Sequence, residues 1–282
     1  MVEKNSFLKP RFNFKNKILK KVSKKILSRN QIFKNIHSGE SCYLFGNGAS
    51  IKFMDLSKFD DKPGLACTFL WLHKDFKKLD VRYYSTIAPF WFYPLRRHPT
   101  IKNNIKFNYL AQMQKKILKD FPDLYFFTSL SNYLGLGGKN VYYLHHFDEK
   151  LSDNSYDMTN NFFFHGAIEA LICQAIYMGF KKAYLVGFDY THHPQRLGHF
   201  YEKGKGAFIY DDEYKREFFS WAKKYIELVT ITTENCSSKN MNYISYEDYT
   251  NSKEIYIENN ELVKKKYLNL FHKIGNDDYK IY

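Results

Sequence analysis

Short apolar runs alternate with helical patterns along most of the chain, and this alternation constrains the fold more than any other feature. Apolar runs with the length of strands occur at 42–46, 65–70, 81–86, 124–129, 141–145, 183–188 and 242–246. Stretches with helical periodicity lie between them, at 105–119, 166–179, 211–229 and 261–272. This order predicts an α/β fold, in which helices flank a mostly parallel, Rossmann-like sheet. A chain of 282 residues can form one large domain or two small ones, and we expect one domain over residues 41–282.

Two irregular segments interrupt the pattern, at 147–164 and 189–210. The first is polar and lacks periodicity until its last three residues. The second contains Pro194 and three glycines among aromatic residues and histidines. Long loops inside a compact domain are commonly functional. We therefore predict that both segments are lid loops that contact the substrate.

The first forty residues form a distinct basic segment. They contain eleven Lys or Arg residues and two acidic ones, in a chain of formal charge +14. Apolar residues recur at helical spacing among the lysines, namely Ile18, Leu19, Val22, Ile26 and Leu27. Residues 1–40 are therefore predicted to be a basic amphipathic arm, and residues 11–36 to be able to bind an anionic membrane surface. A solvated arm is the alternative, and nucleic acid is not an expected partner because no binding motif accompanies the charge.

The cysteines and the apolar runs bear on where the protein works. The four cysteines, at 42, 67, 173 and 236, are widely spaced, so they indicate neither a zinc site nor a disulfide framework. The N-terminus lacks the apolar core of a signal peptide, and no apolar run is long enough to cross a bilayer. We expect a cytoplasmic protein, either free or peripheral on the inner face of the cell membrane.

A glycine-rich turn follows the first predicted strand. The sequence Gly46-Asn47-Gly48-Ala49-Ser50 removes bulky side chains where the strand enters a predicted helix. Such a turn presents backbone N–H groups at a positive helix end, where a phosphate can approach. Gly46, Asn47, Gly48 and Ser50 are therefore candidate nucleotide-binding residues. Ile51 stands where the dinucleotide fingerprint has its third glycine, so a tight turn without a ligand is the alternative.

A second candidate region surrounds the most apolar helix, at 166–179. Its N-terminus, at His165-Gly166, is another potential anion site. The strand at 183–188 follows this helix, and Asp189, Tyr190 and His192 come directly after the strand. Open α/β sheets bind ligands at the carboxyl ends of their strands. This position makes these residues site candidates.

The sequence "LGHFY", residues 197–201, supplies candidates for proton transfer. Histidine is the commonest general base for activating a hydroxyl group, and His199 lies in a loop that gives it reach. His192 precedes it in the same loop. Tyr190 and Tyr201 could donate hydrogen bonds to a departing phosphate. This combination suits group transfer.

Several common catalytic motifs do not occur in the sequence. There is no phosphate loop, no nucleophile elbow, no zinc-binding H-E-x-x-H helix and no D-x-D pair of the kind that holds a divalent metal on a nucleotide sugar. The adjacent pairs His145-His146 and His192-His193 lack a partner at ligand spacing. We expect neither a bound metal nor a cofactor, and a metal-independent reaction is favoured.

Three stretches together resemble a known family: "CYLFGNGASI", "QAIYMGFKKAYLVGFDY" and "LGH". They are similar to the bacterial sialyltransferases that use CMP-sialic acid to cap lipooligosaccharide. They also resemble uncharacterised polysaccharide biosynthesis proteins related to the archaeal pterin diphosphokinases of the MptE type. The likeness covers about residues 41–230. In the sialyltransferases the first motif reads G-N-G-P-S, so Ala49 replaces a proline.

The resemblance implies a Rossmann-like transferase of the GT-A type. Asn47 would contact the nucleotide phosphate, Tyr190 would stabilise the leaving phosphate, and His199 would be the general base. Two family asparagines appear here as Thr68 and Ser85, which would hold the ribose and cytosine differently. The helix-entry turn His165-Gly166-Ala167 stands where the family has Thr-Ser-Gly.

The expected function is metal-independent transfer of a sialic acid-like sugar, a nonulosonate or Kdo, from a CMP-activated donor to a surface glycan or glycolipid acceptor. One alternative is an MptE-like diphosphokinase that uses ATP and magnesium. Another is a non-catalytic scaffold in glycan assembly. The chain could also form a homo-oligomer.

Overall fold

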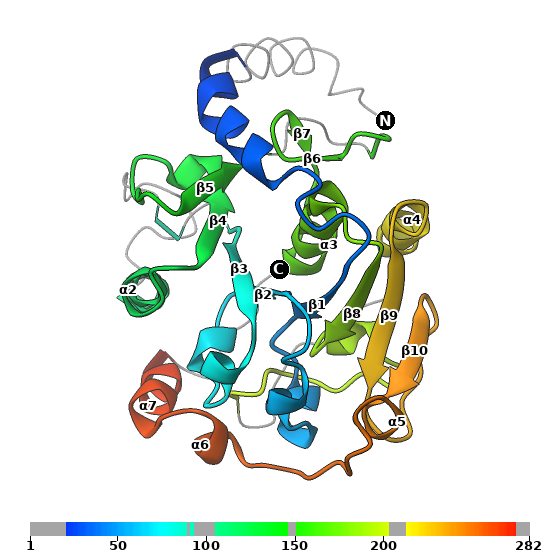
Figure 1. Ribbon diagram of the computed structural model, residues 1–282. Coiled ribbons are helices and arrows are strands. Elements are labelled where there is room, and N and C mark those ends of the chain that lie inside the picture. Colours follow the sequence, from blue (N-terminus) through cyan, green and yellow to red (C-terminus); the bar gives the residue numbers. More distant parts are fainter. Residues whose placement is uncertain (1–20, 89–90, 93–104, 146–150, 203–212, 275–282) are drawn as a thin grey trace, which may run out of the picture.

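An eight-stranded sheet forms the centre of the computed structural model, which describes residues 21–88, 91–92, 105–145, 151–202 and 213–274 (Figure 1). The strands are β1 (Ser41–Phe45), β2 (Gly64–Cys67), β3 (Val81–Thr86), β4 (Tyr125–Ser129), β5 (Val141–Leu144), β8 (Lys182–Val186), β9 (Glu227–Thr232) and β10 (Asn242–Ser245). Their order is β10-β9-β8-β1-β2-β3-β4-β5, and all neighbours pair in parallel. The predicted α/β fold with a mostly parallel, Rossmann-like sheet is confirmed.

The strand order reverses direction between β1 and β8. From β1 the chain adds β2 to β5 on one side, and it then crosses back to add β8, β9 and β10 on the other. In open parallel sheets, ligands bind outside the carboxyl ends of the strands at such a reversal. The loops that follow β1 and β8 therefore occupy the position where this fold class places its sites.

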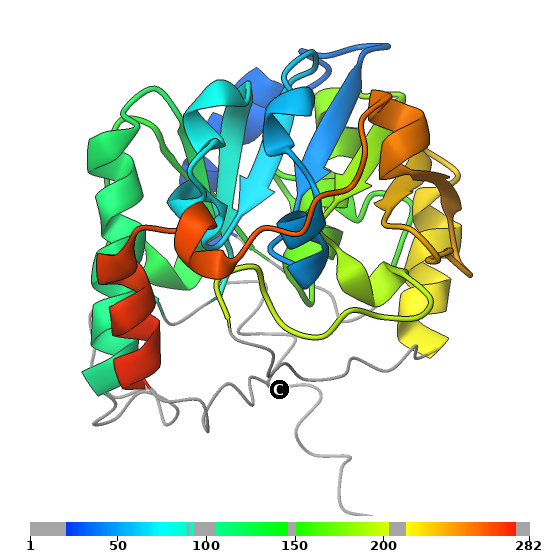
Figure 2. The ribbon, with the colours of Figure 1, turned by 90° about the horizontal axis from the view of Figure 1, so that it is seen from below.

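Helices cover both faces of the sheet. The α-helices are α2 (Ile105–Asp120), α3 (Ala167–Met178), α4 (Glu213–Ala222), α5 (Tyr246–Thr250), α6 (Asn259–Leu262) and α7 (Lys265–Ile274). The 3₁₀ helices are η1 (Ser28–Phe33), η2 (Ala49–Phe53), η3 (Leu56–Lys58), η4 (Leu70–Leu72), η5 (Phe76–Lys78), η6 (Leu130–Asn132) and η7 (Asp189–Thr191). Figure 2 shows α2 and α7 at one end of the sheet and α4 at the other.

Alternate residues of each strand enter two separate cores. In β1, Cys42 and Leu44 pack in the core shared with α3 and α4, whereas Tyr43 and Phe45 pack in the core shared with α2 and α7. This is the two-residue period of a strand that is buried on both faces. It explains why the strands appear in the sequence as continuous apolar runs.

Two predicted helices differ from the structure. The helix expected over 211–229 ends at Ala222, and the chain then enters β9, a strand that the sequence did not reveal. Val229, Thr230 and Ile231 are β-branched and favour the sheet over the helix. The helix expected over 261–272 is divided into α6 and α7, because Val263 adopts an extended conformation.

The segment that precedes β1 lies along the sheet (Figure 1). Arg29 donates to the carbonyl oxygens of Lys139 and Val141, and Asn30 Nδ2 donates to that of Tyr143 at 2.9 Å. These bonds cover the outer edge of β5, which would otherwise expose unpaired carbonyl groups. Phe33 is buried and packs edge-on against aromatic residues of β3, β4 and β5.

The predicted basic arm is thus divided. Residues 27–40 pack as part of the α/β body, and backbone N–H groups at positions 35, 37 and 39 bond to the last carbonyls of α3 and to Gly179. Leu27 is buried, whereas Val22, from the same predicted apolar stripe, is exposed. Residues 1–20 lie outside the described residues, so their binding to a membrane stays a prediction. None of the helices described is both long enough and apolar enough to cross a bilayer.

The predicted lid loops are described only in part. Residues 151–164 contain a hairpin of β6 (Tyr156–Asp157) and β7 (Asn161–Phe162), and Phe162 and Phe163 are buried against α3 and α4. Trp221 of α4 donates to the carbonyl oxygen of Ser152 at 3.0 Å. Residues 189–202 are described and pack at the sheet edge, while 146–150 and 203–212 lie outside the described residues. Closure of either loop over a ligand stays a prediction.

Candidate active site

Three segments that are distant in the sequence meet at the carboxyl edge of β1 and β8. They are the turn after β1 (Gly46–Ser50), the turn after β8 (Gly187–Thr191) and the segment Gly198–Glu202. The N–H group of Gly48 donates to the carbonyl of Gly187 at 2.7 Å, and that of Ala49 donates to the carbonyl of Gly198 at 3.2 Å. Gly48 and His199 form an antiparallel bridge. The motifs that carried the family resemblance are therefore neighbours in space.

The glycines of the first turn are required by contact with the chain itself. A Cβ atom at position 46 would lie 2.3 Å from the carbonyl oxygen of Gly187, and one at position 48 would lie 2.2 Å from Asp189 Oδ1. Both distances are far shorter than any real contact. The sequence predicted that something comes close to this bare turn, and in the structure it is the loop that follows β8.

Asp189 occupies the position where the sequence predicted a phosphate. Its carboxylate accepts hydrogen bonds from the backbone N–H of Ser50, at 2.7 Å, and from the Ser50 hydroxyl. Burial raises the pKa of Asp189 to about 6, although the bonds from Ser50 and the nearby Arg196 and His199 act in the opposite direction. The turn leads into η2, a 3₁₀ helix of five residues rather than an α-helix. A phosphate would have to displace Asp189 to bind these groups.

The other residues predicted to bind the nucleotide differ in accessibility. Asn47 ties the first turn to the end of β2, since its Nδ2 donates to the Cys67 carbonyl at 3.1 Å and its Oδ1 accepts from Phe69 N at 3.3 Å. Thr68 follows Cys67, is partly exposed and has a φ of 55°. Ser85 is buried and donates to Gln174 Oε1 at 2.8 Å, so its hydroxyl faces α3 rather than the edge.

The N-terminus of α3 lies at the same edge. Gly166 is its N-cap residue, and His165, just before it, is exposed. Glu169, in the first turn of α3, folds back toward Gly166, and a Cβ atom at position 166 would lie 2.7 Å from its Oε2 atom. Tyr190 lies within electrostatic reach of Glu169 and of Cys67. Tyr190 follows β8, so these interactions place its phenol near the start of α3 and the end of β2.

The two candidate histidines have opposite environments. The His199 side chain is 43% exposed, and its Nδ1 atom lies 3.0 Å from Glu202 Oε1. His192 is buried, and this burial lowers the pKa of its imidazole to about 4. Of the two, His199 is the one that can meet an incoming hydroxyl group.

Aromatic stacking fixes the plane of the His199 ring. The ring lies parallel to that of Tyr201, with centroids 5.1 Å apart, and Tyr201 stacks on Phe271 of α7 at 4.6 Å. Tyr201 is buried in the core, and the ring of Tyr190 is mostly buried. Burial raises the pKa of Tyr190 well above its usual range, so its phenol stays protonated and can donate a hydrogen bond.

Sequence reasoning missed three charged residues of this region: Lys52, Glu169 and Glu202. Lys52 is buried, and its Nζ donates to the carbonyl of Glu202 at 2.8 Å. Glu202 follows His199 by three positions in "HFYE", and Glu169 follows Gly166 by three in "GAIE". Three-residue spacing places two groups on one side of a helical turn, so it was a signal at the start of the predicted helix 166–179 but not in the loop of His199.

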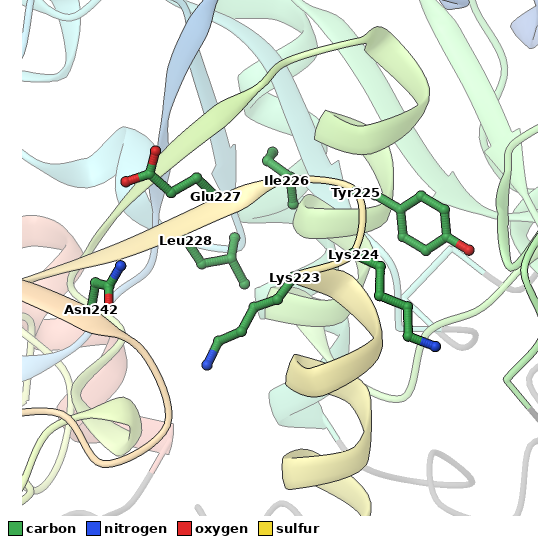
Figure 3. A pocket seen from close by; sticks show the side chains of 7 residues that line it. All are labelled: Lys223, Lys224, Tyr225, Ile226, Glu227, Leu228 and Asn242. Atoms are coloured by element: carbon green, nitrogen blue, oxygen red, sulfur yellow. The ribbon is translucent and has the colours of Figure 1, made fainter.

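A cavity with a volume of about 460 Å³ lies away from these segments, at the amino end of β9 and β10 (Figure 3). Lys223, Lys224, Glu227 and Asn242 are among the residues that line it. Lys223 already donates to the carbonyl of Asn240. Within the described residues, no three His, Cys, Asp or Glu side chains gather as a potential metal site.

Comparisons with known proteins add one structure. No protein-family model matches the chain, and no curated protein matches it. The chain is similar to the sialyltransferase CstII from Campylobacter jejuni, whose structure holds a substrate analogue, cytidine-5'-monophosphate. The match has 12% identity and a TM-score of 0.31, and it covers 85% of this chain and 98% of the other. At these values the similarity carries no weight for function.

Proposed function

We propose that this chain is a glycosyltransferase that moves a sialic acid-like sugar, a nonulosonate or Kdo, from a CMP-activated donor to a glycan acceptor. The observation that carries the proposal is the convergence of the three family-like motifs at the β1 and β8 reversal, where Gly48 pairs with His199. The sequence resemblance supplies the substrate class. The structure supports the proposal because the residues that carry the resemblance lie together.

His199 acts as the general base in this proposal. Its ring accepts the proton of the acceptor hydroxyl as that oxygen bonds to the anomeric carbon of the sugar. The bond between this carbon and the CMP phosphate breaks, and the phosphate leaves with the electron pair. Tyr190 donates a hydrogen bond to the leaving phosphate. Tyr201 holds the His199 ring in place by stacking. His192 is buried and has a structural role in this proposal.

The donor phosphate is proposed to lie between Thr68, Tyr190 and the start of α3. Asp189 closes the turn after β1, so Gly46, Gly48 and Ser50 shape the site rather than hold the phosphate directly. Asn47 keeps the ends of β1 and β2 at a fixed separation. Ser85 stabilises the position of α3 through Gln174.

Thermal-shift measurements with CMP, CDP, UDP, GDP and ATP test this proposal, each with and without magnesium. Stabilisation by CMP without metal supports the transferase. Stabilisation by ATP with magnesium supports the diphosphokinase instead. Stabilisation by no nucleotide supports the scaffold.

The role of His199 is tested by transfer activity. General bases contribute roughly 10²- to 10⁴-fold, so His199→Gln is expected to lower kcat by about that factor. His193→Gln is the matched control, because His193 is exposed in the same loop and precedes Pro194. Full activity of folded His199→Gln would show that another group takes the proton.

Binding to an anionic membrane is proposed for the basic segment that precedes β1. Lys21, Lys24 and Lys25 are exposed on its helical start, beside Val22, which is 71% exposed. Replacing these three lysines by Gln leaves the packed residues 27–40 intact. The replacement is expected to weaken binding to phosphatidylserine vesicles, and unchanged binding would contradict the proposal.

A further inference from the structure

The loop that carries His199 holds a carboxylate to which the family resemblance gives no role. We infer that Glu202 is a positioning residue for His199, and that it sets which ring nitrogen faces the acceptor. This inference rests on the proposed transfer reaction. The contact between the two side chains is nevertheless independent of any substrate, and so is its test.

One carboxylate group contacts His199 twice. Glu202 Oε2 accepts a hydrogen bond from the backbone N–H of His199 at 2.9 Å. Glu202 Oε1 lies 3.0 Å from His199 Nδ1. The second oxygen lies off the direction of the Nδ1–H bond, so this contact acts mainly through charge. Both contacts place the negative charge on the Nδ1 side of the ring.

The Glu202 carboxylate is itself held in place. Its side chain is 13% exposed, compared with 43% for that of His199. The Glu202 N–H donates to the His199 carbonyl at 2.9 Å, and the Glu202 carbonyl accepts from Lys52 Nζ at 2.8 Å. Tyr201 stacks on the His199 ring and fixes its plane. The pair is therefore preorganised by its own loop and by η2, which carries Lys52.

This geometry assigns different parts to the two ring nitrogens. A carboxylate beside Nδ1 favours the tautomer with the proton on Nδ1, which leaves a lone pair on Nε2 for the acceptor proton. When Nε2 takes that proton, the ring becomes an imidazolium, and the carboxylate of Glu202 stabilises its charge. Asp189 is a second acidic group near His199, but its oxygens are committed to Ser50.

Nitrogen-15 NMR of the histidine side chains tests the contact without a substrate. The full chain is labelled at histidine, and His199→Gln identifies the signals of His199. Glu202→Gln removes the charge but keeps an oxygen for the His199 N–H, and we expect it to shift the ring signals away from the Nδ1–H tautomer. Glu258→Gln is the matched control, because Glu258 is the other carboxylate that acts on Lys52. Unchanged His199 signals in Glu202→Gln would overturn the inference.

Kinetics then tests what the contact does. Glu202→Gln is expected to lower kcat by roughly tenfold or more, with KM for the CMP-sugar within about twofold of the parent. Glu202→Asp, which keeps the charge, should recover part of the loss, and Glu258→Gln should behave as the parent. Equal kcat in the parent and in Glu202→Gln would overturn the positioning role. Retained activity in His199→Gln would instead contradict the proposed base, while the NMR result would still decide the contact.

Discussion

The two glycine-containing entrances to helices, at Gly46–Ser50 and at Gly166, look alike in the sequence but have different surroundings. The first is closed by the turn after β8, and its N–H groups bond to Gly187 and Asp189 of that turn and to the Gly198 carbonyl. The second begins the twelve-residue helix α3 and is partly exposed, with the side chain of Glu169 folded beside it. A bare turn can therefore mark the close approach of two chain segments as readily as that of a ligand. Of the two entrances, the start of α3 is the more accessible to an anion.

The largest effect is expected at the first entrance, Gly46–Ser50, where backbone atoms of another turn are in close contact. Gly46→Ala would bring a methyl group to 2.3 Å from the Gly187 carbonyl oxygen, which belongs to the backbone and cannot rotate away. We expect a loss of about 3 kcal/mol in the free energy of unfolding, because the two turns must separate. Gly137→Ala, which meets nothing within 4 Å, is the control and should change the value by less than about 0.5 kcal/mol. Urea unfolding measures both.

Gly166→Ala is expected to lower the free energy of unfolding by less than Gly46→Ala does. The atom nearest to its Cβ is the end of the Glu169 side chain, which can rotate. A loss as large as that of Gly46→Ala would show that the α3 entrance is as closed as the first turn. The difference between the entrances would then disappear.

A smaller effect is expected from the carboxylate that closes the first turn. The pKa of Asp189 is raised from its ordinary 3.8 to about 6, mainly by burial. The folded state thus favours the protonated form, so the contribution of Asp189 to stability is largest below about pH 3.8 and is lost as the pH rises through about 6. We expect the unfolding free energy of the parent, relative to Asp189→Asn, to fall by about 2 kcal/mol between pH 4 and pH 7. A constant difference over this range would show that folding does not shift the pKa of Asp189.

Local patterns in the sequence predicted most strands of the sheet but missed β9. The buried strands were recognisable because continuous apolar runs are required wherever both faces of a strand are covered, as in β1 and β8. Strand β9 was predicted as part of a helix because the apolar pattern continues across the end of α4. The residues of this pattern are Phe218, Trp221, Leu228 and Ile231. A helix and a strand cannot be separated by such a pattern alone.

The site shows the same limit at the level of single residues. Gly48, Asp189 and His199 were each candidates, but the sequence could not show that Asp189 would fill the turn beside Gly48. That contact depends on the parallel pairing of β1 with β8, which is set by the whole sheet. Glu202 was missed because a carboxylate three positions from a histidine has meaning only once the loop geometry is known.

The smallest expected effect tests the accessible entrance. Glu169 carries a buried carboxylate in the first turn of α3, where it opposes the attraction of the helix N-terminus for an anion. If the donor phosphate binds there, Glu169→Gln should raise the affinity for CMP by about two- to fivefold, which corresponds to the usual interaction of a charge with a helix end. Isothermal titration calorimetry without magnesium measures this change, and Glu217→Gln, an exposed carboxylate on α4, is the control. Equal affinities would place the phosphate away from α3, and weaker binding to Glu169→Gln would mean that the carboxylate holds the nucleotide through a group other than its phosphate. Either result would remove the functional distinction between the two entrances, although their structural difference would remain.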